Sequence, residues 1–141
     1  QKMSKSDENP NATILMLDSA DAITNKIKRA VTDSIGIVAY NDEQKGIKNL
    51  INIYSTFTGE STEAIVSKYE GKGYGDFKRE TAEVIVEGLR PVREKYEYLM
   101  ENKDYLEEIY AKGAAKAHNK ARKTLDKVYR KVGFVQAKRS E

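Results

Sequence analysis

The sequence predicts an all-α protein, a helical bundle that follows a polar loop at the start of the chain. Apolar residues recur at intervals of three and four over most of the chain, which is the spacing of one face of an α-helix. Only two prolines interrupt the 141 residues. Serine or aspartate precedes several of the periodic stretches and glycine follows them, as at the ends of helices.

The first part of the chain is expected to be a loop over residues 1–11. Residues 12–17 are a short apolar run, for which we consider a short strand, although six residues could equally form buried loop or helix. Asp18 or Ser19 is a suitable N-cap for a helix over about residues 19–33.

Two shorter helices are expected after a connecting segment. The first covers about residues 46–57 and stops at Gly59, and the second covers about 62–70 and is capped by Ser61. The glycine-rich run 71–75 could cradle a phosphate at a helix N-terminus. Without a preceding strand, however, this run is better read as a turn.

Two longer helices complete the predicted bundle. An apolar stripe extends over residues 77–99, and Pro91 should kink that helix or split it near Arg90. The last helix is expected over about residues 103–132, with Gly133 ending it.

Composition indicates a polar globular chain, with 39% apolar and 33% charged residues. The absence of cysteine excludes disulfides and thiolate metal sites. The single histidine, His118, cannot form a metal site alone, so we expect none. No apolar run approaches the roughly 20 residues that span a bilayer. Four tyrosines fall on apolar stripes and are expected in the core rather than as base-stacking platforms: Tyr54, Tyr69, Tyr96 and Tyr110.

The net charge is only +3, but the charges are unevenly distributed. Acidic residues concentrate between residues 94 and 108, and basic residues between 112 and 139. At 100° per residue, seven cations of the last helix share a sector of roughly 100°, apart from its apolar stripe. A solvated lysine face is the alternative, but few acids lie four residues away, and such stripes are typical of nucleic-acid interfaces. The seven are Lys112, Lys116, Lys120, Lys123, Lys127, Arg130 and Lys131.

The start of the chain holds two lysines, Lys2 and Lys5, among small hydroxylated residues. Ammonium groups on flexible stems suit the neutralisation of a departing polyphosphate. Serine hydroxyls can add hydrogen bonds to phosphate oxygens. For five residues alone, a solvated tail is the simpler interpretation.

The string Lys2-Met3-Ser4-Lys5-Ser6 resembles the KMSKS signature of class I aminoacyl-tRNA synthetases. The stretches KMSKSDENPNATILMLD, KIKRAVTDS, NLINIYS and YEGKGYGDFK resemble bacterial-type tryptophanyl-tRNA synthetases. This resemblance runs from Lys2 to about Gly133, nearly the whole chain.

The resemblance implies a division of the chain into three parts. Residues 1–17 would hold the KMSKS loop and the end of the catalytic domain, 18–133 a helical anticodon-binding domain, and 134–141 a frayed tail. The family's HIGH-type histidine motif and tryptophan pocket do not occur in this sequence, which begins with Gln1. We therefore expect a C-terminal fragment that is inactive alone.

The resemblance also implies the chemistry of the full enzyme, which activates tryptophan with ATP and Mg²⁺ and esterifies tRNA(Trp). Lys2 and Lys5 would be catalytic, stabilising the pyrophosphate charge, and ATP would be bound by Lys2, Met3, Ser4, Lys5 and Ser6. We expect no cofactor on the fragment itself, a cytoplasmic homodimer with contacts mostly outside this stretch, and neither membrane nor DNA as partner. The alternatives are a non-catalytic helical RNA-binding module and the related tyrosyl-tRNA synthetase.

Overall fold

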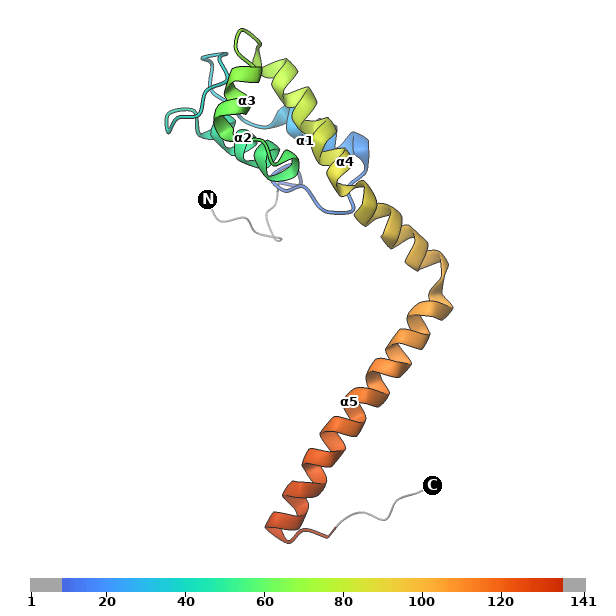
Figure 1. The fold of residues 1–141 in the computed structure, drawn as a ribbon. Coiled ribbons are helices and arrows are strands. Elements are labelled where there is room, and N and C mark those ends of the chain that lie inside the picture. The colour runs from blue at the N-terminus through green and yellow to red at the C-terminus, as the bar shows by residue number, and fades with distance from the viewer. Residues whose placement is uncertain (1–8, 136–141) are drawn as a thin grey trace. The chain divides into compact units, whose positions relative to one another are not determined.

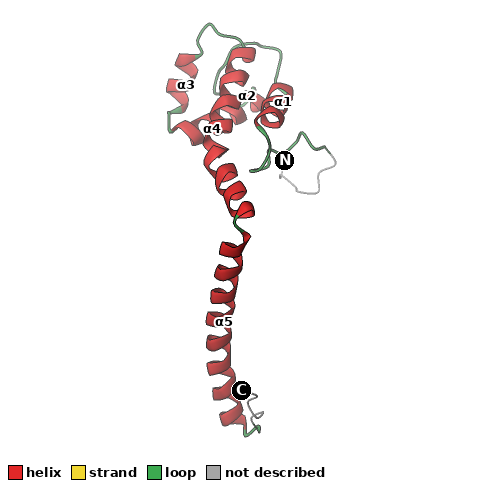
Figure 2. Cartoon of the chain, turned by 90° about the vertical axis from the view of Figure 1, so that its right-hand side faces the viewer, coloured by secondary structure: helices red, strands yellow, loops and turns green. Residues whose placement is uncertain are grey.

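The computed structural model describes residues 9–135, and this part of the chain contains five α-helices and no strand (Figures 1 and 2). The predicted all-α class is therefore confirmed. The chain divides into two compact units, Gln1–Lys95 and Tyr96–Glu141. The helices are α1 (Ala20–Arg29), α2 (Lys45–Thr58), α3 (Thr62–Lys68), α4 (Tyr74–Glu101) and α5 (Lys103–Val132).

The strand considered over residues 12–17 does not form. The backbone there makes local bonds instead, since the Asp18 N–H donates to the Leu15 carbonyl at 3.1 Å and closes a turn. The Leu15 N–H is taken by the Asp18 carboxylate at 2.8 Å. The N–H groups of Leu15 and Asp18 are thus bonded to residues close in sequence, and the described residues contain no strand with which this segment could pair.

Helix α1 begins where its cap predicts but ends earlier than expected. The Ser19 hydroxyl accepts a bond from the Ala22 N–H at 3.2 Å and caps the first turn. At the other end, Ala30 has ψ 132°, so the helix stops at Arg29 rather than near residue 33. The Ala30 carbonyl is then free to accept a hydrogen bond from Lys78 of α4 at 2.8 Å, a contact that sequence periodicity does not reveal.

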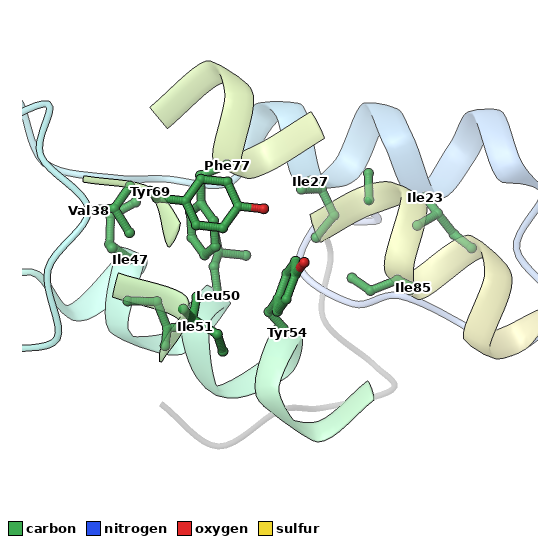
Figure 3. Packing of buried hydrophobic residues seen from close by; sticks show 12 residues of the cluster. Ile23, Ile27, Val38, Ile47, Leu50, Ile51, Tyr54, Tyr69, Phe77 and Ile85 are labelled. Carbon is green, nitrogen blue, oxygen red and sulfur yellow. The ribbon is translucent and has the colours of Figure 1, made fainter. Parts of the chain in front are cut away.

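The core of the first unit is formed by α1 to α4 and the segments between them (Figure 3). Tyr54, Tyr69 and Phe77 pack with ring centroids 4.9–6.2 Å apart, and each is 2% exposed or less. The predicted burial of Tyr54 and Tyr69 is confirmed. The remaining buried apolar residues are Ile23, Ile27, Val38, Ile47, Leu50, Ile51, Ile65, Ala82 and Ile85.

Helix α4 continues through Pro91. Of the two effects predicted for this proline, a kink or a split near Arg90, the split therefore does not occur. Only the first half of its apolar stripe is buried, with Ile85 the last buried residue. Tyr96 is 46% exposed and Tyr110 is 66% exposed, so their predicted place in the core is wrong.

Helix α5 has the predicted bounds, and Gly133 ends it with a left-handed φ of 80°. None of its residues is buried. A helical apolar stripe indicates which face can pack, and does not establish that this face is covered.

Gly46, in the first turn of α2, lies against the chain that leaves α1. A Cβ at this position would lie 2.2 Å from the Val31 carbonyl oxygen, which is backbone and cannot move aside as a side chain can. Helix α2 can approach residues 31 and 32 only because this position is glycine.

We predict that Gly46→Ala lowers the free energy of unfolding by about 1–3 kcal/mol, the usual cost of overpacking. Gly75→Ala is the matched control, because a Cβ there meets nothing within 4 Å. The measurement is chemical denaturation of both variants. Equal stability of Gly46→Ala and the unsubstituted protein would contradict the close approach of Val31.

Candidate nucleic-acid interface

The KMSKS residues, Lys2 to Ser6, lie outside the described residues, which begin at Asn9. The structure describes the segment that follows them, and there one lysine of α1 organises the backbone. The Lys26 ammonium donates to the Thr13 carbonyl at 2.8 Å and to the Asp18 carboxylate at 2.7 Å. Both charged side chains are 13% exposed. Lys26 and Asp18 thus anchor the end of the segment that leads from the motif into α1.

The Asp18 carboxylate is held in its charged form. Burial raises its pKa, but the hydrogen bonds from Lys26 and the Leu15 N–H, with the Lys26 charge, lower it below the ordinary value of 3.8. The pair is therefore intact at neutral pH.

The seven predicted cations of α5 are all exposed. Lys112 forms an ion pair with Glu108, one turn earlier in the helix. Arg130 donates to the Asp126 carbonyl at 3.3 Å, a neutral acceptor. No carboxylate of the described chain forms an ion pair with the other six.

This stripe can therefore bind a polyanion without first breaking ion pairs, Lys112 excepted. Flexible ammonium groups along one helix face suit phosphates spaced along a nucleic-acid backbone. His118 is also exposed on this helix.

The start of α4 is tied to the segment between α1 and α2. The Tyr74 hydroxyl donates to the Asp33 carboxylate at 2.5 Å, and the Gln44 amide donates to the Tyr74 oxygen at 2.7 Å. The bond from Tyr74 is the main cause that lowers the pKa of Asp33. Asp33 therefore bridges two parts of the fold.

Lys78, one turn further along α4, was not singled out from the sequence. Its ammonium donates to the Ala30 carbonyl at 2.8 Å and to the Thr32 hydroxyl at 3.1 Å. Burial lowers the pKa of Lys78. The sequence did not indicate the role of Lys26 either. Each of these lysines lies at a polar position of an amphipathic helix, and each has an acceptor that is distant in sequence.

The run Gly71 to Gly75 forms a turn and the first residues of α4, as the simpler reading of the sequence predicts. Gly71 has φ 75°, and the Lys72 N–H donates to the Tyr69 carbonyl at 3.0 Å. Helix α4 begins at Tyr74.

No helix within residues 9–135 is both long enough and apolar enough to cross a membrane. The same residues contain no group of three or more His, Cys, Asp or Glu side chains that could hold a metal ion.

Residues 1–90 match the family model described as tRNA synthetases class I (W and Y). The chain is 55% identical to a tryptophan–tRNA ligase of Clostridium perfringens over 135 residues, which are 96% of this chain and 41% of that protein. It is 51% identical to that of Bacillus anthracis over 99% of this chain and 42% of that protein. The chain thus spans about two fifths of the length of these curated relatives.

A solved structure is also similar to this chain. The crystal structure of tryptophanyl-tRNA synthetase from Campylobacter jejuni matches with a TM-score of 0.75 and 34% identity. The match covers 94% of this chain and 41% of that one.

We predict that the Lys26–Asp18 pair makes the stability of this chain depend on acid. The folded-state pKa of Asp18 is lowered, so its contribution is present above its ordinary value of 3.8 and is lost as the pH falls through the folded value. Asp18→Asn should lower the free energy of unfolding by about 1–3 kcal/mol at pH 7, and by less near pH 3.

The measurement is chemical denaturation of both proteins at several pH values between 3 and 7. Asp21→Asn is the matched control, since Asp21 is an exposed carboxylate near the start of the same helix. A stability difference for Asp18→Asn that does not change with pH would contradict the assignment.

Proposed function

Because this chain belongs to the class I tRNA synthetases of the tryptophan and tyrosine family, we propose that it is the part of a tryptophan–tRNA ligase that carries the KMSKS loop and tRNA-binding helices. The observation that carries the proposal is the 55% identity to a tryptophan–tRNA ligase over 96% of the chain. This similarity favours tryptophan over tyrosine and an enzyme over a separate RNA-binding module.

The reaction has two steps. The tryptophan carboxylate attacks the α-phosphorus of ATP, and the bond to the bridging oxygen breaks, giving tryptophanyl adenylate and pyrophosphate. A ribose hydroxyl at the 3′ end of tRNA(Trp) then attacks the activated carbonyl and releases AMP. Negative charge accumulates on the departing pyrophosphate in the first step, and this is where fixed positive charge lowers the barrier.

Lys2 and Lys5 are the proposed source of that charge, and Met3, Ser4 and Ser6 complete the ATP-binding loop. Mg²⁺ is proposed to come with ATP as part of the substrate. The described residues offer no cluster of three or more His, Cys, Asp or Glu side chains for it.

The bonds from Lys26 to Thr13 and Asp18 anchor the chain where the proposed loop segment, 1–17, joins the proposed helical domain, 18–133. Leu15, Met16 and Leu17 are 49–59% exposed. Apolar side chains at the surface beside a catalytic loop are suited to packing against the rest of a larger enzyme.

The cationic stripe of α5 is proposed to bind the tRNA backbone. Its residues are exposed, and six of the seven have no ion pair within the described chain. Such contacts position the RNA and do not read its bases. A homodimer acting in the cytoplasm is the assembly and location that we propose with this function.

We predict that Lys5→Ala, made in the full-length protein that carries this chain, lowers the rate of tryptophan-dependent ATP–pyrophosphate exchange by about 100-fold or more. The loss arises because one of two charges aimed at the leaving group is removed. Exchange by the unsubstituted protein with tyrosine in place of tryptophan is the control for the amino acid. Efficient exchange with tyrosine alone would reject the tryptophan assignment, and an unchanged rate in Lys5→Ala would reject the role of Lys5.

We predict that Lys116→Glu, Lys120→Glu and Lys123→Glu, made singly in the full-length protein, each weaken tRNA binding. Each should also flatten the dependence of log affinity on log salt by about one unit or less. The measurement is a salt titration of tRNA binding.

Arg122→Glu is the matched control for the stripe. Arg122 is exposed on the same helix but lies about 120° away from Lys116 around its axis. If the three stripe variants bound tRNA no more weakly than Arg122→Glu, the stripe would be a solvated lysine face.

A further inference from the structure

Helices α1 and α4 line a pocket in the first unit. Its residues lie between 24 and 82 in the sequence and include none of the α5 stripe. Its lining includes Thr24 and Lys28 of α1 and Tyr74, Gly75, Lys78 and Arg79 of α4. Figure 1 shows α1 next to the first half of α4.

Three cations line this pocket, and the described chain offsets only one of them. Arg79 pairs with the Asp76 carboxylate at 2.7 Å. Lys78 is partly buried and donates only to the neutral oxygens of Ala30 and Thr32. Lys28 is exposed and forms no ion pair within residues 9–135.

Lys78 is the informative member of this group. An ammonium group has three N–H donors, and the structure uses two of them. Burial costs this cation solvation and lowers the pKa of Lys78, and the two oxygens that Lys78 contacts supply no counter-charge. An anion placed in the pocket would supply that charge.

The rest of the pocket wall consists of Thr24, Tyr74, Gly75 and Ala82. Tyr74 is held in place through its hydroxyl, which is bonded to Asp33 and Gln44. Ala82, 1% exposed, also lines the pocket. A rigid aromatic ring next to cations matches a nucleotide, whose phosphate needs charge and whose base or sugar needs a flat or apolar surface.

We propose that this pocket binds a phosphodiester group of the tRNA, with the adjoining nucleoside against the Tyr74 ring. The inference rests on the proposed function for its partner, since tRNA is the polyanion that a tRNA ligase must hold. The pocket is suited to one nucleotide in a defined position, whereas the α5 stripe offers a row of mobile charges.

Gly75→Glu in the full-length protein tests the proposal without removing a structural contact. A Cβ at Gly75 meets nothing within 4 Å, and its φ is not in the left-handed region. Glutamate is a better helix former than glycine, and its charge is favourable near a helix N-terminus. Thermal unfolding should therefore show no loss of stability.

We expect Gly75→Glu to weaken tRNA binding about tenfold and to flatten the salt dependence by about one unit or less. Gly75→Gln, of similar size but neutral, should lose at most about threefold. Lys28→Glu should weaken binding to a similar extent as Gly75→Glu. Lys45→Glu is its control, since Lys45 is exposed on α2 and lines no part of this pocket.

The outcomes separate this inference from the proposed function. If the unsubstituted protein fails to bind or charge tRNA, the proposed function is wrong. If it binds tRNA, and Gly75→Glu and Lys28→Glu bind equally well, only the pocket assignment is overturned. In that case, weaker binding of inorganic pyrophosphate by the two variants, measured by calorimetry, would show that the pocket takes a free phosphate instead.

Discussion

The first turns of α4 hold the irregular segment between α1 and α2, and the packing of the first unit depends on these bonds. Residues 30–44 form neither helix nor strand, so no regular hydrogen-bond pattern satisfies their polar groups. From α4, the Tyr74 hydroxyl donates to one oxygen of Asp33, and Lys78 donates to the carbonyl of Ala30. Within the segment, the Gln44 amide donates to the carbonyl of Ile37. This arrangement fixes the chain where α1 ends and lets α2 approach it at Gly46.

The same bonds give the α1–α4 pocket its chemistry. Lys78 stabilises the end of α1 through neutral acceptors, so its charge stays available, whereas a carboxylate partner would have neutralised it. The Tyr74 ring cannot rotate away without breaking two short hydrogen bonds of its hydroxyl. Contacts that stabilise the fold thus also prearrange a cation beside an aromatic surface, which reduces the entropy lost when a ligand binds.

The two cationic surfaces of this chain are built differently. The α5 stripe arises from spacing along one helix, and its exposed, flexible side chains can follow an extended backbone. The α1–α4 pocket arises where two helices meet, and two of its three charges, Lys78 and Arg79, are held by other groups. Lys26 shows a third use of a lysine, as the anchor of the segment that follows the KMSKS motif. Lysine side chains therefore stay exposed on α5 but bond to the fold at Lys26 and Lys78, according to the partners that the fold supplies.

The sequence by itself determined the helical class, the bounds of α5, the cap at Ser61 and the family, because each depends on residues close together in the chain or on a local motif. It also located the α5 stripe, since helical spacing alone places those cations on one face. Tertiary structure decided where α1 ends and that Tyr96 and Tyr110 are exposed. Local hydrogen bonds between Leu15 and Asp18 accompany the absence of a strand at residues 12–17. Tertiary structure also decided the roles of Lys26 and Lys78, whose acceptors include groups 13 and 48 residues away. Periodicity reports which face of a helix is apolar or charged, but only the fold determines which groups lie opposite that face.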